Sequence, residues 1–114
     1  MRKLHHFGLP TEEKQPGETY VPETKVYVTD PLVHPQKIEF LRYGPDTPVT
    51  GPVRQMPHIA YACDDMEAEI EGCEILLGPF EAMPGLRVVF VLKEGAVVEF
   101  MEFAEGVDWG TSDC

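Results

Sequence analysis

The sequence predicts a single α+β domain that is built from two similar halves, the first with its helix reduced or lost. Its 114 residues, 43% of them hydrophobic, are enough for one core but not for two independent ones. Residues 26–43 match residues 86–103 without a gap at a shift of 60 positions, and the shift places Glu39 on Glu99. Neither half could bury its apolar face alone, so we expect both to pack together over residues 1–114.

The first half, about residues 4–45, begins with a short strand at His6 in the segment "HFGL". The following segment, "TEEKQPGETYVPE", is broken by Pro16 and Gly17, and we therefore expect its helix to be reduced to a turn or lost. Residues 26–43 then predict a β-hairpin, because two runs of β-branched and aromatic residues flank the polar turn "DPLVHPQ".

The second half, about residues 56–104, repeats this order after a proline-rich linker over residues 44–57, which we expect to be extended. Its first strand, "HIAY", begins at His58 and matches "HFGL" at a shift of 52. Further strand material is expected around "EILLG", before the hairpin at residues 86–103. The acidic tail, residues 105–114, is expected to be a loosely ordered end.

The second half also carries a helix signal that the first half lacks. Asp64 or Asp65 can cap a short helix, and Met66 and Ile70 share one of its faces at i, i+4 spacing. The two halves therefore differ mainly in this one element.

Each half supplies one histidine in its first strand and one glutamate in its last strand. Both glutamates interrupt apolar runs, "KIEFLRY" and "VVEFMEF", where a buried and unpaired carboxylate is costly or takes up a proton. Two carboxylates and two imidazoles at equivalent positions of the repeat indicate a divalent cation as the compensating charge. The candidate metal ligands are His6, Glu39, His58 and Glu99. This set suits Zn, Ni, Co, Mn or Fe(II), and the sequence does not rank these metals.

Strand alternation indicates which neighbours share a face with the candidate ligands. Glu99 shares its face with Val97 and Met101, whereas Glu102 lies on the opposite face and is expected to meet solvent. Alternation also lets only one of two adjacent residues point into a cavity.

The histidine strands contain small residues that leave room above the sheet for a ligand. Gly8 shares a face with His6, and Ala60 shares a face with His58. Alignment of the two strands selects His6 as the inward-facing histidine, and the adjacent His5 is the alternative.

Composition and charge exclude several classes of function. The net charge of −11 argues against nucleic acid and against an anionic membrane surface, because both require clustered Lys and Arg. We expect Cys63 and Cys73 to be small core residues, and the odd number of cysteines favours a reducing cytoplasm. No run approaches 18 apolar residues, so no transmembrane span is expected. The cations that could hold a substrate anion, each expected to be an ordinary surface charge, are Arg42, Arg54, Arg87 and Lys93.

The pattern "LHHFGL … KIEFLRY … PHIAYACDD … GAVVEFMEF" resembles the vicinal oxygen chelate superfamily over residues 4–103. That superfamily includes glyoxalase I, methylmalonyl-CoA epimerase, extradiol dioxygenases and bleomycin-resistance proteins. The resemblance implies paired βαβββ modules in a curled mixed sheet around a cavity. It also implies that the first and last strands of each module hold the metal, through His6, Glu39, His58 and Glu99. The sequence departs from the family in its missing first helix and in showing no loop for glutathione or coenzyme A.

The His/Glu/His/Glu set is most similar to that of glyoxalase I. We therefore expect a metal-dependent isomerase or lyase that stabilises an enediolate of a small oxygenated substrate, with Glu39 or Glu99 as general base. A non-catalytic protein that binds an antibiotic or another small molecule is the main alternative. A relative of the extradiol dioxygenases or epimerases, and a metal that only stabilises the fold, are further alternatives. We expect a homodimer, because open sheets leave edges to cover.

Overall fold

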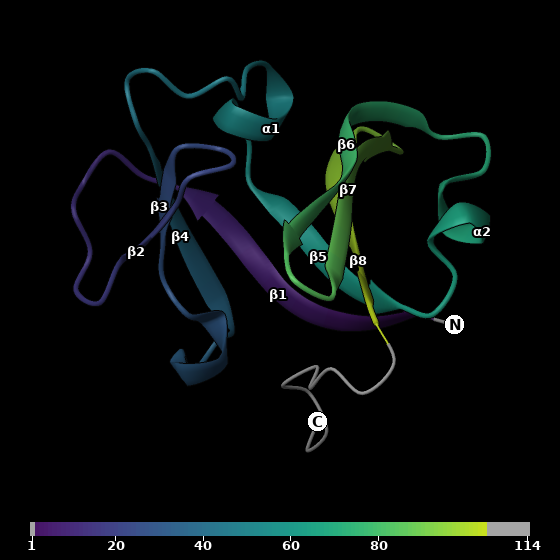
Figure 1. The fold of residues 1–114 in the computed structure, drawn as a ribbon, viewed down its shortest axis with the longest axis horizontal. Helices are drawn as coiled ribbons and strands as arrows, with labels where there is room; N and C mark the ends of the chain where they lie inside the picture. The colour runs from purple at the N-terminus through teal and green to yellow at the C-terminus, as the bar shows by residue number, and fades with distance from the viewer. Residues whose placement is uncertain (1, 105–114) are drawn as a thin grey trace.

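The computed structural model describes residues 2–104, which form a curled, eight-stranded mixed sheet with few helices (Figure 1). The strands are β1 (Arg2–Pro10), β2 (Thr19–Val21), β3 (Val26–Val28), β4 (Ile38–Tyr43), β5 (His58–Cys63), β6 (Glu74–Met83), β7 (Leu86–Lys93) and β8 (Ala96–Phe103). The helical elements are η1 (Pro31–Val33), α1 (Pro52–Gln55) and α2 (Met66–Ile70). The predicted fold class, α+β with a curled mixed sheet, is confirmed.

The two halves of the chain have the same strand arrangement on either side of the sheet centre. Across the sheet the order is β2-β3-β4-β1-β5-β8-β7-β6. β1 pairs in parallel with β4, β5 pairs in parallel with β8, and β1 and β5 run antiparallel where the halves meet. Figure 1 accordingly places β2, β3 and β4 on one side of the molecule and β6, β7 and β8 on the other.

Only the second half has a helix between its first two strands. Asp65 caps α2 by accepting a hydrogen bond from the Ala68 amide at 3.2 Å, and Met66, the first residue of the helix, is fully buried. In the first half, residues 11–18 form bends and turns with no helix. The predicted loss of the first helix is therefore confirmed, and the helix-breaking pair Pro16–Gly17 accounts for it.

Both predicted hairpins are present, since β3 pairs antiparallel with β4 and β7 pairs antiparallel with β8. The linker differs from the expected extended chain, because it contains α1. Gly51 supplies a positive φ of 68° before the helix, and Pro52 at its first position has a φ already suited to a helix. The turn also buries Val53, which gives the helix a packing role that the proline pattern did not indicate.

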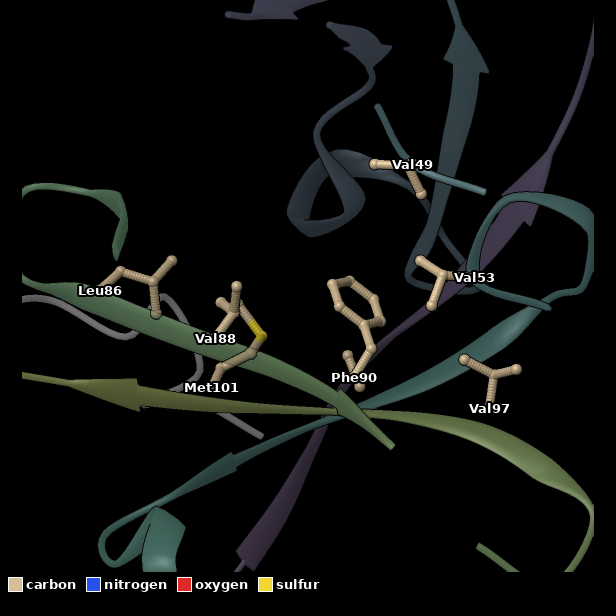
Figure 2. Close-up of a cluster of buried hydrophobic side chains, with 8 residues drawn as sticks. Val49, Val53, Leu86, Val88, Phe90, Val97 and Met101 are labelled. Atoms are coloured by element: carbon tan, nitrogen blue, oxygen red, sulfur yellow. The ribbon is translucent and has the colours of Figure 1, made fainter. Parts of the chain in front are cut away.

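The two faces of β8 belong to two different hydrophobic clusters. On one face, Val97 and Met101 pack with β7 and with the linker, as Figure 2 shows. On the other face, Val98 and Phe100 pack near α2 with Met66. Burying each of these side chains contributes about 1.5–3 kcal/mol, so both faces of the strand hold the second half together.

No helix within residues 2–104 has the length and apolar character needed to cross a membrane. The acidic tail at residues 105–114, predicted to be a loosely ordered end, lies outside the described residues.

Candidate metal centre

Two rows of three residues cross the middle of the sheet, each with an imidazole at one end, a carboxylate at the other and a small residue between them. From the strand register, one row is His6, Ala60 and Glu99, and the other is Glu39, Gly8 and His58. Partners in register lie on the same face of a sheet. Each row takes its histidine from one half and its glutamate from the other, so the four predicted ligands share one face.

The ends of the four side chains converge on one place. His6 Nε2 lies 3.4 Å from Glu39 Oε1 and 3.5 Å from Glu99 Oε1. His58 Nε2 lies 3.2 Å from the same Glu99 oxygen. His6, Glu39 and His58 each offer one ligand atom, and these atoms all lie within 4.8 Å of one another. This buried group could hold a metal ion, and Glu99 lies beside it.

Gly8 is required by the position of the His58 ring. A Cβ atom on Gly8 would come 2.0 Å from His58 Cε1 and 2.4 Å from Nε2, which is far inside contact distance. The imidazole therefore occupies the space that any side chain at position 8 would fill. His58 and Phe90 also form a T-shaped ring pair, with centroids 5.3 Å apart at 88°, so the imidazole is packed between Gly8 and Phe90.

Both the composition of the donor set and its unsatisfied nitrogen atoms fit a metal ion. His6 Nε2, His58 Nε2 and His58 Nδ1 are buried and make no hydrogen bond of good geometry with any described residue. Buried polar atoms in native proteins are nearly always satisfied, so such atoms require an explanation. Two imidazole nitrogens and two carboxylates facing one point are the donors that first-row divalent ions prefer.

In the absence of a metal, the cluster would hold a proton as a substitute positive charge. Burial lowers the pKa of His6, but its contacts with the carboxylates of Glu39 and Glu99 outweigh that effect and raise the pKa to about 10. Burial likewise raises the pKa of Glu99, and the imidazoles of His58 and His6 outweigh it and lower the pKa to about 2. The site is thus built to hold negative carboxylates next to positive charge.

His5 also points into the interior, so the expectation that alternation admits only one of the two histidines is wrong. The β1–β5 register shifts between Leu4 and His6, and this irregularity turns consecutive side chains to the same side. His5 and His6 are both buried, and their Nδ1 atoms lie 2.7 Å apart. One ring must donate and the other accept, so this contact couples the tautomers of the two rings. His6 presents Nε2 to the carboxylates, and His5 stands behind it.

Glu102 is not left to solvent as predicted. One of its carboxylate oxygens accepts a hydrogen bond from the Met66 amide at 3.0 Å, at the start of α2, and the other pairs with Arg87 at 3.0 Å. Glu102 does lie on the face of β8 opposite to Glu99, as strand alternation predicts, but that face carries α2. Cys63 agrees with its predicted core role, because burial raises the pKa of its thiol to about 11 and suppresses the reactive thiolate.

A cavity of about 370 Å³ lies above the cluster, within the curl of the sheet. His6, Glu39 and Glu99 form its polar end, and Phe90 is one of the apolar residues that line it. Pockets of about 300–1,000 Å³ are typical of small-molecule sites. The His/Glu cluster therefore opens onto a space that can hold a ligand.

No family model matches the chain, and no curated protein matches it. A crystal structure of hypothetical protein BH1468 from Bacillus halodurans C-125 is similar in fold, with a TM-score of 0.66 and 20% sequence identity. The match covers 94% of this chain and 98% of that one. It shows that the two proteins share their fold.

Proposed function

We propose that this protein is a divalent-metal-dependent enzyme of the glyoxalase type within the vicinal oxygen chelate superfamily, acting as an isomerase or lyase on a small oxygenated substrate. The observation that carries the proposal is the convergence of two imidazoles and two carboxylates from equivalent strands beneath a ligand-sized cavity. The donor set suits Zn, Ni, Co, Mn or Fe(II) and does not select one of them.

The proposed holding residues are His6 and His58 through Nε2, with the carboxylates of Glu39 and Glu99. A bound divalent ion would supply positive charge to two neighbouring substrate oxygens while the adjacent carbon loses a proton. Glu39 or Glu99 would take that proton and return it to the neighbouring carbon, which moves one hydrogen and leaves the oxidation state of the whole molecule unchanged. Both carboxylates border the cavity, so either can reach a bound substrate.

Metal content is the first test of the proposal. Untagged protein should retain about one divalent ion per chain, measured by inductively coupled plasma mass spectrometry, and His58→Ala should lose it. Glu99→Gln has a matched control in Glu102→Gln, the same change in the same strand on the opposite face. Unchanged metal content in both His58→Ala and Glu99→Gln would refute the site.

Turnover is the second test, and it also separates the two glutamates. The probes are hemithioacetals of methylglyoxal, one made with glutathione and one with uncharged 2-mercaptoethanol. If a glutamate acts as the base, the variant with glutamine at that position should keep its metal and lose turnover. If a glutamate serves only as a ligand, the variant with glutamine at that position should lose its metal first.

A binding protein without turnover is the second candidate, and the apolar walls of the cavity favour it. Most of the cavity is lined by aliphatic and aromatic side chains, which suits sequestration of a hydrophobic small molecule. This candidate predicts saturable ligand binding with no change in the ligand after prolonged incubation. Metal-dependent conversion of either hemithioacetal would exclude it.

A further inference from the structure

The cavity above the His/Glu cluster has an unusual distribution of charge. Its only ionisable groups at the polar end are histidines and glutamates, and its walls are apolar side chains from both halves of the sheet and from the linker. Representative wall residues are Leu41, Val53, Leu86, Val88 and Phe90. Tyr43 also borders the space, but its hydroxyl donates to the Val53 carbonyl at 3.2 Å.

No Lys or Arg side chain borders this cavity. All nine lie within the described residues 2–104, and none of them lines the space. Two of the four cations that the sequence indicated for holding an anion, Arg42 and Arg87, are engaged in ion pairs. Arg42 is bound by both carboxylate oxygens of Glu18, at 2.7 and 2.8 Å, and stacks on Tyr27. Arg87 pairs with Glu102 and Glu67.

The charge balance at the polar end disfavours an anionic ligand. The two carboxylates of Glu39 and Glu99 would neutralise the charge of a bound divalent cation. The metal-bound site would then have no net positive charge to attract an anion. A ligand carboxylate, phosphate or sulfonate would then enter an apolar space without a counter-charge, which is strongly unfavourable. The net charge of −11 adds long-range repulsion.

We infer that the cavity takes an uncharged, largely apolar molecule whose oxygen atoms face the His/Glu cluster, and that it excludes anionic molecules of the same shape. The inference rests on the proposed function in one respect only: the oxygen atoms of the ligand would face a metal ion held by the His/Glu cluster. It narrows the proposed substrates to uncharged molecules. Glutathione adducts and coenzyme A thioesters are excluded, because both carry negative groups.

A matched pair of fluorescent probes tests the charge preference directly. N-phenyl-1-naphthylamine is uncharged, and 8-anilinonaphthalene-1-sulfonate has the same ring system with one added sulfonate. Fluorescence titration of the full chain in excess chelator should give a dissociation constant at least about tenfold lower for the uncharged probe. Equal affinities, or tighter binding of the sulfonate, would overturn the inference.

Two arginine variants of β6 test whether the preference arises in this cavity. Met83 lines the cavity and is 58% exposed, whereas Ile75 in the same strand is 42% exposed and does not line it. Met83→Arg should strengthen sulfonate binding about tenfold and leave the uncharged probe unchanged, because it adds the missing counter-charge at the rim. Ile75→Arg should change neither. Equal effects of the two variants would overturn the inference, because they would reflect net charge alone.

The probe titration and the metal analysis test the two proposals independently of each other. The titration uses metal-free protein, so an intact charge preference with no retained metal would contradict the proposed function alone. Retained metal together with equal probe affinities would contradict this inference alone.

Discussion

Glu99→Gln should destabilise the metal-free protein by about 3 kcal/mol at pH 7. The Glu99 carboxyl is nearly buried, and its pKa falls from 4.5 to about 2 next to the two imidazoles. Each pKa unit corresponds to about 1.4 kcal/mol, so the ionised carboxylate contributes about 3 kcal/mol that a neutral amide cannot supply. The raised pKa of His6 reports the same contacts, and only one of the two is counted.

The sign of the pH dependence follows from both shifts. The lowered pKa of Glu99 gives stability that is present above pH 4.5 and lost as the pH falls through about 2. The raised pKa of His6 gives stability that is present below pH 6.5 and lost as the pH rises through about 10. The difference between wild type and variant should therefore be largest at about pH 4.5–6.5 and decline toward either extreme.

Urea unfolding in excess chelator, followed by circular dichroism, measures this difference in a chain of this size. Glu102→Gln is the control, and it should cost less than about 1 kcal/mol because its ion pair with Arg87 is partly exposed. A Glu99→Gln variant as stable as wild type at pH 6 would refute the electrostatic account of the cluster.

Three further predictions concern the geometry around the histidines. Gly8→Ala should lower the free energy of unfolding by about 1–3 kcal/mol and abolish metal retention. In a His58→Ala background the same change should lower stability by almost nothing, because the clashing ring is gone. Equal losses of stability in both backgrounds would contradict the steric explanation. His5→Ala should weaken metal binding about 10–100-fold in calorimetric titration, while His5→Asn, which keeps an acceptor near His6 Nδ1, should retain most of the affinity; a loss as large for Asn as for Ala would indicate a packing role only. Metal affinity should rise about tenfold per pH unit between pH 6 and 8, since the raised pKa of His6 requires about one proton to leave on binding; calorimetry in buffers of different ionisation enthalpy counts that proton, and a count of zero would contradict the assignment.

The internal repeat made most of the fold predictable from the sequence. It located both hairpins, matched the two histidine strands as equivalent segments and identified the half that lost its helix, because each of these depends on local periodicity and turn residues. Glu39 and Glu99 stood out as candidate ligands because a carboxylate in a core strand is costly unless it is compensated.

Three features depended on tertiary structure and were missed. The turn of helix in the linker forms because Val53 can be buried between the halves, which a count of prolines does not reveal. The inward position of His5 requires a strand irregularity, and strict alternation excludes it. Glu102 contacts α2 from the neighbouring strand face, a contact between segments 36 residues apart.

Homodimerisation, a cytoplasmic location and the enzyme class stay predictions. Size-exclusion chromatography with light scattering would give the first, with a mass of twice 12.8 kDa expected. A mass of 12.8 kDa at micromolar concentration would show a monomer.

We propose that one divalent ion binds between His6, Glu39, His58 and Glu99. X-ray diffraction from metal-loaded crystals, measured at the absorption edge of the ion, would locate it. We predict one anomalous peak per chain, at about 2.0–2.2 Å from the Nε2 atoms of His6 and His58 and from at least one of the two carboxylates. A peak elsewhere in the molecule, or no peak from crystals grown with saturating metal, would contradict the account.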